Sequence, residues 1–363
     1  MKKIFTASLL VLLCWQVKSQ YLAAFLDYQQ HFWVFEAGEF NELEYLPIQD
    51  FQVGGNLVAY KDNGSKLKIY EHGNTKTLMT GDPVKYTATD YLLGYSLYEE
   101  LHVYVNGEAK LLSTQTGGYV IQDSLIGWYN KVSQNIQVYY NGRVYTVEDG
   151  LIYNPLQNYK TGDNTAAYIQ SSTKQFKLFY QGNIIVLDDF AENMIYKAGR
   201  DIVAFCDSLD QTFYVFYKGD VIELESFQPK SFKIGDDMMV YVDNLGKLKY
   251  FANGKTTTLS NYEPLFYNVV DKSLVYEEQG FFKTYCNGEV QTIERYIPTI
   301  YRLDFNTIAY LDENSFVKAF QFCEPLTINY EKVKEIDIIR DLIIFVQGIN
   351  KTEIYFNGRL YEH

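Results

Sequence analysis

The 363-residue chain is poor in the residues that most often carry catalysis or bind metals. It contains only four histidines (His31, His72, His102 and His363), four cysteines and no Gly-x-Ser-x-Gly nucleophile motif. No two histidines have the spacing of zinc ligands, and no loop has as many acidic residues as an EF-hand. We therefore expect no catalytic residue, no metal site and no cofactor.

Positive charge is also scarce, with 32 Lys and Arg against 45 Asp and Glu and a net charge of −13. Nucleic acid and anionic membranes repel such a chain unless it has a local basic patch, and the sequence has no run of Lys or Arg. No apolar run of 18 residues follows the N-terminal segment, so we expect no direct membrane insertion.

The N-terminal segment has the pattern of a signal peptide. Lys2 and Lys3 precede a short apolar stretch, and Ser19 ends a small-residue cleavage site, which predicts a signal peptide at residues 1–19 and a mature domain at 20–363. Cys14 raises a lipoprotein alternative, but "VLL" precedes it in place of the usual small residue, so we do not favour lipidation. The mature chain keeps 29 basic and 45 acidic residues, a net charge of −16.

An odd number of cysteines remains after cleavage, namely Cys206, Cys286 and Cys323. In an oxidising compartment they form at most one disulfide. We favour unpaired cysteines buried in strands over any bridge, and leave the pairing of Cys286 with Cys323 open.

Two landmarks recur through the chain with spacings of 33 to 40 residues, close to 35. The first is an aromatic residue that closes a short apolar segment, and it gives ten copies, at Phe25, Tyr60, Tyr95, Trp128, Tyr168, Phe205, Tyr241, Tyr276, Tyr310 and Phe345. The second is a turn glycine, missing only from the ninth copy, which has Phe322-Cys323 instead; it lies at Gly38, Gly73, Gly107, Gly142, Gly182, Gly219, Gly254, Gly288 and Gly358. A fixed period of this length indicates a propeller, a solenoid or an array.

Each copy has the pattern of four short β-strands. Segments such as "KLKIY" (66–70) alternate in polarity, and an Asn-Gly dipeptide often follows, as a type I′ hairpin requires. No helical periodicity persists, and a solenoid would have shorter coils with fewer hairpins. We predict an all-β propeller of about ten four-stranded blades. The first copy lacks an innermost strand, which leaves three arrangements open: a ring with one three-stranded blade, a ring closed in another way, or two smaller propellers. We favour one large ring.

In this arrangement the repeats resemble the TolB-type and WD-like propellers of bacterial envelope proteins. In that pattern a polar turn is followed by an "LAF"-like strand, an "LYV"-like strand and a glycine turn. The Ser-Pro-Asp-Gly turn of TolB repeats is absent here, and of the "WG" repeats only Gly127-Trp128 is present, in reversed roles. The resemblance implies an exported interaction module.

The 34 Tyr and 24 Phe are the other candidates for function. Most occupy fixed repeat positions and are expected to fill the space between blades. Aromatic and basic residues that break the pattern are better candidates for contacting a partner: Phe32, Trp33, Phe35, Arg295, Tyr296 and Tyr301. Acidic pairs such as Asp236-Asp237 fall at turns, and we interpret them as solvated turn residues.

Two functions compete. The first is a non-enzymatic periplasmic module that binds a protein partner of the envelope; the second is a carbohydrate-binding or carbohydrate-active secreted propeller. Four or more convergent acids at the channel mouth, or a His-acid pair, would exclude the first. The last copy runs to His363 and leaves no room for a type IX sorting domain, so we expect a periplasmic location. In size, compartment and acidic, Tyr-rich character the chain resembles the periplasmic plug subunit of the type IX secretion translocon, an outer-membrane complex.

Overall fold

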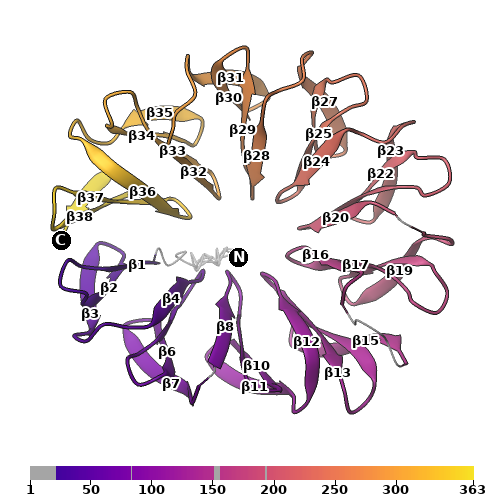
Figure 1. The fold of residues 1–363 in the computed structure, drawn as a ribbon, viewed down its shortest axis with the longest axis horizontal. Coiled ribbons are helices and arrows are strands. Elements are labelled where there is room, and N and C mark those ends of the chain that lie inside the picture. The colour runs from indigo at the N-terminus through magenta and orange to yellow at the C-terminus, as the bar shows by residue number, and fades with distance from the viewer. Residues whose placement is uncertain (1–21, 83, 151–155, 193) are drawn as a thin grey trace, which may run out of the picture.

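The computed structural model describes residues 22–82, 84–150, 156–192 and 194–363, which form one ring of ten β-sheets around a central channel (Figure 1). The described residues contain strands and no helix, so the predicted all-β propeller is confirmed. The predicted signal peptide lies outside the described residues. None of the described segments is a helix that could cross a membrane.

Blade 1 has three described strands and the other nine blades have four, numbered here from the channel outward. The strands of blades 1 to 5 are β1 (Leu22–Leu26), β2 (Phe32–Glu36) and β3 (Glu39–Glu44); β4 (Asp50–Val53), β5 (Val58–Lys61), β6 (Lys66–Glu71) and β7 (Asn74–Thr80); β8 (Val84–Ala88), β9 (Leu93–Leu97), β10 (Glu100–Val105) and β11 (Glu108–Ser113); β12 (Thr116–Ile121), β13 (Leu125–Asn130), β14 (Asn135–Tyr140) and β15 (Arg143–Asp149); β16 (Tyr159–Thr161), β17 (Thr165–Ile169), β18 (Phe176–Tyr180) and β19 (Asn183–Asp188).

Those of blades 6 to 10 are β20 (Tyr196–Gly199), β21 (Ile202–Cys206), β22 (Phe213–Tyr217) and β23 (Asp220–Glu225); β24 (Ser231–Ile234), β25 (Met238–Val242), β26 (Leu248–Ala252) and β27 (Lys255–Ser260); β28 (Tyr267–Val270), β29 (Ser273–Glu278), β30 (Phe281–Cys286) and β31 (Glu289–Glu294); β32 (Tyr301–Asp304), β33 (Thr307–Leu311), β34 (Val317–Gln321) and β35 (Glu324–Thr327); β36 (Val333–Ile339), β37 (Leu342–Gln347), β38 (Lys351–Phe356) and β39 (Arg359–Glu362).

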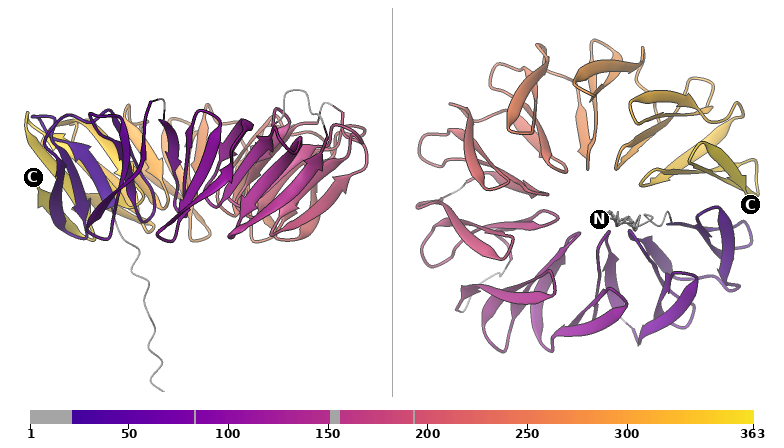
Figure 2. Two further views of the ribbon diagram at one scale, coloured as in Figure 1. Left: turned by 90° about the horizontal axis from the view of Figure 1, so that it is seen from below. Right: turned by 180° about the vertical axis from the view of Figure 1, so that it is seen from behind.

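The antiparallel order gives the disk two different faces (Figure 2). In a four-stranded blade, the turn after the first strand and the turn after the third strand lie on one face, which we call the hairpin face. The turn after the second strand and the segment that leads to the next blade lie on the opposite face, which we call the link face. The link face is turned to the viewer in Figure 1.

The hairpin face contains the predicted Asn-Gly turns. Asn106-Gly107 has φ values of 51° and 82°, and Asn253-Gly254 has 53° and 71°, as a type I′ turn requires at both central positions. The landmark glycines therefore mark the hairpin between the third and fourth strands in the four-stranded blades that have one, and the hairpin between β2 and β3 in blade 1.

The landmark aromatics fill the space between blades, as predicted. Trp128, Tyr60, Tyr95, Tyr168, Tyr241 and Tyr276 are among the largest fully buried side chains. The Tyr241 hydroxyl donates to Glu225 of the preceding blade at 2.8 Å, and Lys249 binds both Glu225 and Asp243. Tyr60 and Tyr310 have equivalent networks, so each such glutamate ties two blades together.

The ring closes without a strand shared between the first and last blades. The aromatic Phe25 lies on β1, which therefore corresponds to the second strand of the other blades, and no innermost strand is present among the described residues of blade 1. Apolar side chains of blades 1 and 10 pack together across this seam: Ala23, Phe25, Phe35, Leu342, Ile344, Ile354 and Phe356. The three-stranded first blade is one of the closures that the sequence left open.

Our preference for unpaired cysteines is wrong for two of the three. Cys286, at the end of β30, forms a disulfide with Cys323, with the two Cα atoms 5.8 Å apart. Cys323 occupies the place of the missing ninth glycine, beside the hairpin of blade 8, which is why the repeat breaks there. Cys206 is buried and unpaired, as expected.

Candidate functional site

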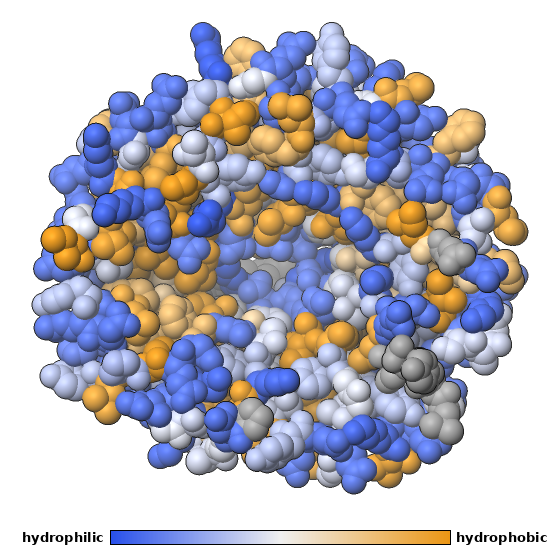
Figure 3. Space-filling view, viewed as in Figure 1, coloured by the Kyte–Doolittle hydropathy of each residue, from blue (hydrophilic) through white to orange (hydrophobic). Residues whose placement is uncertain are grey.

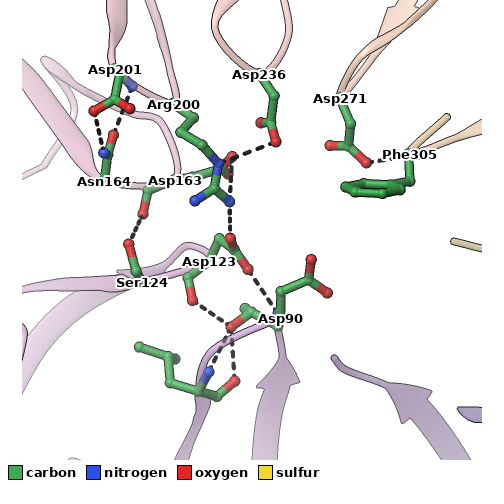
Figure 4. Close-up of polar contacts among 12 residues, drawn as sticks. Asp90, Asp123, Ser124, Asp163, Asn164, Arg200, Asp201, Asp236, Asp271 and Phe305 are labelled. Atoms are coloured by element: carbon green, nitrogen blue, oxygen red, sulfur yellow. Dashed lines mark hydrogen bonds and ion pairs between the residues drawn. The ribbon is translucent and has the colours of Figure 1, made fainter. Parts of the chain in front are cut away.

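The turns between first and second strands form a ring of charged side chains at the hairpin-face mouth of the channel. Eight successive blades, from blade 3 to blade 10, each contribute one charged residue to it, in the order Asp90, Asp123, Asp163, Arg200, Asp236, Asp271, Asp304 and Arg340. Blade 2 contributes Gly55 at this position. We call these eight residues the charged ring. Figure 4 shows most of it.

Glycines let neighbouring turns approach closely around the charged ring. A Cβ atom at Gly235 would lie 2.1 Å from the carbonyl oxygen of Asp271, and one at Gly55 would lie 2.4 Å from that of Asp90. The Asp236 N–H donates to the Asp271 carbonyl at 2.7 Å, so the turns also bond directly to one another. A larger residue at these positions would push the turns apart and widen the mouth.

Arg200 is the charged centre of one side of the ring (Figure 4). Its guanidinium forms ion pairs with Asp123, with Asp163 at 3.3 Å and with Asp236 at 3.1 Å. Because these acids belong to blades 4, 5 and 7, one arginine of blade 6 joins four blades.

Arg340 has a comparable role across the seam. Its Nε and Nη2 atoms donate to the two carboxylate oxygens of Asp90 at 3.1 and 2.5 Å. Its backbone N–H donates to the Asp304 carboxylate at 2.7 Å. The side chain passes Gly55, where a Cβ would lie 2.9 Å from Nη2. Arg340 thus links blade 10 to blade 3, over the part of the ring where blade 1 contributes no inner strand.

Burial raises the pKa values of several acids of the ring, and the excess of six carboxylates over two guanidiniums adds to the shift. Burial, and then repulsion from Asp90, raises the pKa of Asp123 to about 6 even though Arg200 opposes the shift. Burial, and then a hydrogen bond with Asp236, raises the pKa of Asp163. The pKa of Asp271 is likewise raised by burial and by the charges of Asp236 and Asp304.

The charged ring lines a cavity of about 310 Å³, to which Phe305 and Gln122 also contribute. The six convergent acids exceed the count of four that we expected to exclude a non-enzymatic module, and this counts against that function. Each acid, however, already binds an arginine or a backbone N–H, as Asp271 does with Phe305 at 3.2 Å. No group of acids, histidines or cysteines among the described residues has a geometry that would hold a metal ion. The arrangement can exchange protons, and it fixes the width of the mouth.

The link face differs from the hairpin face in its apolar side chains. Of the large apolar residues that are exposed in described loops, two lie on the hairpin face, Tyr91 and Phe322. Fourteen lie on the link face: Tyr28, Tyr45, Leu46, Tyr98, Val132, Phe190, Ile195, Leu209, Phe227, Leu245, Tyr262, Leu265, Tyr330 and Ile349. Figure 3 shows this face, with apolar patches around a hydrophilic channel.

The structure corrects part of the predicted partner-contacting set. Phe32 and Phe35 are completely buried between blades, so they cannot contact a partner. Trp33 is half-buried, where its indole N–H donates to Asp27 at 3.1 Å and its ring packs against His363.

The remaining three predicted residues lie apart from the first group, in blades 8 and 9. Tyr301 is half-buried on β32, and its hydroxyl accepts from Asn268 at 2.7 Å. Arg295 is exposed and Tyr296 half-buried in the link that leads to β32. These two stay predictions.

Sequence reasoning missed the charged ring. Asp236 was interpreted as a solvated turn residue, yet it pairs with Arg200 and its side chain is only 11% exposed. The signal that could have revealed the ring is positional: an acid or arginine precedes the second strand of most copies, often directly after a glycine, as in "GD" at 162–163 and "GR" at 199–200.

The architecture defines a class, a propeller with ten blades. The chain belongs to the ten-bladed β-propeller domain family, whose model matches residues 16–361. No curated protein matches the chain.

Several solved propellers are similar in structure. The computationally designed Ika8 protein has a TM-score of 0.37 and 12% identity, covering 85% of this chain and 96% of its own. The CRINKLY WD40 ectodomain of the Arabidopsis thaliana receptor kinase ACR4 has a TM-score of 0.33 and 8% identity, covering 66% of this chain and 94% of its own. PorZ, a surface component of the type IX secretion system of Porphyromonas gingivalis, has a TM-score of 0.31 and 11% identity, covering 77% of this chain and 44% of its own. We draw no functional conclusion from these likenesses.

Proposed function

We propose that the protein is a non-enzymatic periplasmic propeller that binds a protein partner of the bacterial envelope through its link face. The observation that carries this proposal is the uneven distribution of exposed apolar loop residues, fourteen on the link face against two on the hairpin face. Exposed apolar residues gathered on one side of a soluble molecule are typical of interaction surfaces. The aromatic members of the set also suit such a surface, since tyrosine offers apolar area and a polar hydroxyl.

The rigidity of the ring supports the same proposal. Inter-blade networks such as Tyr241–Glu225–Lys249, together with the Arg200 and Arg340 ion pairs, hold the blades in fixed positions. A surface that is already ordered loses little conformational entropy on binding. The disk would therefore present its loops to a partner with little rearrangement.

The test is recovery of a partner by the full chain from envelope extracts in mild detergent. We expect wild type and the control Val144→Asp, an exposed position on the outer strand β15, to recover the same partner. The double variant Tyr262→Asp/Leu265→Asp, on the link face, should recover much less. Recovery of the propeller alone, or equal recovery by all three proteins, would contradict the proposal.

A more specific proposal concerns the identity of the partner. We propose the periplasmic mouth of an outer-membrane secretion channel of the type IX kind, which the propeller would plug or regulate. The support is the resemblance to the translocon's plug subunit in size, acidity and tyrosine content. Mass spectrometry of the recovered partner decides this point, and a partner that is not an outer-membrane protein would contradict it while leaving partner binding intact.

The charged ring favours a second candidate, a carbohydrate-active propeller. Asp163 and Asp271 have raised pKa values beside Asp236 and Asp304, and a protonated acid beside a carboxylate is what glycoside hydrolysis uses. Incubation with a panel of bacterial and host glycans should release reducing ends if this is correct, and Asp163→Asn should abolish the release. No hydrolysis of any glycan in the panel would count against it.

A further inference from the structure

Two lysines on the channel side of blades 6 and 7 occupy the same place in the repeat. Lys197 follows Tyr196, which pairs with Phe205, and Lys233 follows Phe232, which pairs with Tyr241. Both reach toward the next blade and donate to the backbone carbonyl of its inner-strand aromatic. Lys197 Nζ donates to Phe232 and Lys233 Nζ to Tyr267, each at 2.7 Å.

Neither lysine has a carboxylate partner among the described residues. Lys233 also bonds the Asn268 amide oxygen at 2.7 Å, and each ammonium lies over an aromatic ring, about 5 Å from its centre. By contrast Lys249 and Lys318, on the third strands, each bind two carboxylates. Two unneutralised cations are therefore adjacent in a chain whose net charge is −13.

The proximity of the two lysines is unfavourable in the absence of an anion. Burial lowers the pKa of Lys197, and repulsion from Lys233 lowers it further. A carboxylate placed between them would relieve this repulsion and use ammonium protons that the carbonyls leave available.

The lysines open into a cavity of about 560 Å³ on the link face, with an apolar wall. Ile195, Leu265 and Phe266 line it, and the Leu265 side chain is 88% exposed. Lys230 and Glu263 at its edge pair with each other, so they add no net charge. The cavity thus combines a positive floor with an apolar wall.

We propose that this cavity binds an acidic segment of the partner protein. The side-chain carboxylate of an Asp or Glu lies between Lys197 and Lys233, and apolar neighbours in the segment pack on Ile195 and Leu265. A protein segment fits better than a small anion because an inorganic anion would leave the apolar wall exposed to water. The inference rests on the proposed link-face docking and specifies its chemistry.

The test uses a random dodecapeptide library displayed on phage and selected against the immobilised full-length protein. We expect the selected peptides to be enriched in Asp or Glu next to Leu, Ile or Phe. Fluorescence polarisation of the selected peptides should show at least tenfold weaker binding to Lys197→Gln/Lys233→Gln, because two charge-assisted hydrogen bonds are lost. Arg302→Gln is the matched control, at the equivalent position of β32 in blade 9, and should bind as wild type does.

Several results would overturn the inference. The first is a selection in which the peptides show no enrichment in Asp or Glu. The second is equal peptide affinity for wild type and the lysine variant. The third is displacement of the peptides by inorganic phosphate together with unchanged peptide affinity in Leu265→Ser. Thermal melts of the lysine variant should match wild type, and a variant that fails to fold is replaced by Lys197→Met/Lys233→Met. If Lys197→Gln/Lys233→Gln still recovers the envelope partner while Tyr262→Asp/Leu265→Asp does not, this inference fails and link-face docking stands.

Discussion

Removal of the disulfide between Cys286 and Cys323 should destabilise the propeller by an amount that follows from the chain between them. The two residues are 37 positions apart, in the third strand of blade 8 and the third hairpin of blade 9. The bond closes this stretch in the unfolded state. In the loop-entropy model a closure of that length contributes about 4 kcal/mol to the free energy of unfolding.

That energy converts to a modest shift in melting temperature because the chain is large. With an unfolding entropy of roughly 2 cal/mol/K for each residue, a 363-residue chain that unfolds as one unit would melt about 5 °C lower. The variant Cys286→Ser/Cys323→Gly should lose less than Cys286→Ser/Cys323→Ser. Position 323 has a φ of 67°, where glycine is unstrained and serine is not.

The assay is differential scanning calorimetry of protein purified without reductant, with and without a reducing agent. Reduced wild type and the Ser/Ser variant should melt at the same temperature, below oxidised wild type. Alkylation of the unfolded, unreduced protein should modify Cys206 and leave Cys286 and Cys323 unmodified. Alkylation of Cys286 and Cys323, or a melting temperature that does not respond to reductant, would refute the reasoning.

The remaining predictions concern the charged ring and the networks between blades. Arg340→Gln should lower the free energy of unfolding by about 1–2 kcal/mol because Asp90 loses a two-pronged partner; a double-mutant cycle with Asp90→Asn measures the coupling, and zero coupling would contradict the assigned role. Between pH 4 and the raised pKa values of Asp163 and Asp271, the folded state binds more protons than the unfolded state, so stability falls as pH rises through that range. Urea unfolding should therefore give a higher stability at pH 5.5 than at pH 8.5, and Asp163→Asn/Asp271→Asn should flatten this dependence; the opposite slope would show that the acids are stabilised as carboxylates. Tyr241→Phe should lower the free energy of unfolding by about 1–2 kcal/mol in the same assay, since Glu225 loses one hydrogen-bond donor but keeps Lys249. If Tyr241→Phe destabilises the protein as much as Glu225→Ala does, Lys249 contributes nothing through Glu225 and the assignment is wrong.

The sequence predicted the blades well because the repeat pattern and the hairpin chemistry are local. An Asn-Gly dipeptide such as Asn253-Gly254 fixes its turn from two residues, and a landmark such as Tyr241 is buried in the same way in each copy. These features depend on period and turn type, which a single chain displays directly.

The charged ring and the disulfide were harder to predict because both join separate blades. Arg340 and Asp90 are 250 residues apart, and only the closed ring brings them together. Asp236 looks like an ordinary turn acid until Arg200 of the preceding blade is placed beside it. Phe32 and Phe35 failed as surface residues for a different reason: they occupy ordinary positions of the third strand. Phe32 is equivalent in register to Phe176 and Phe213, which are also completely buried.

The seam between blades 1 and 10 gives the disk one joint unlike the other nine. Elsewhere a peptide link and interstrand networks connect successive blades, whereas here, among the described residues, side-chain packing and the Arg340 ion pair hold the ring closed. In an array whose units contact only their neighbours, the weakest interface opens first. Opening this joint would turn the closed ring into an open one, and the central channel could then widen without unfolding of any blade.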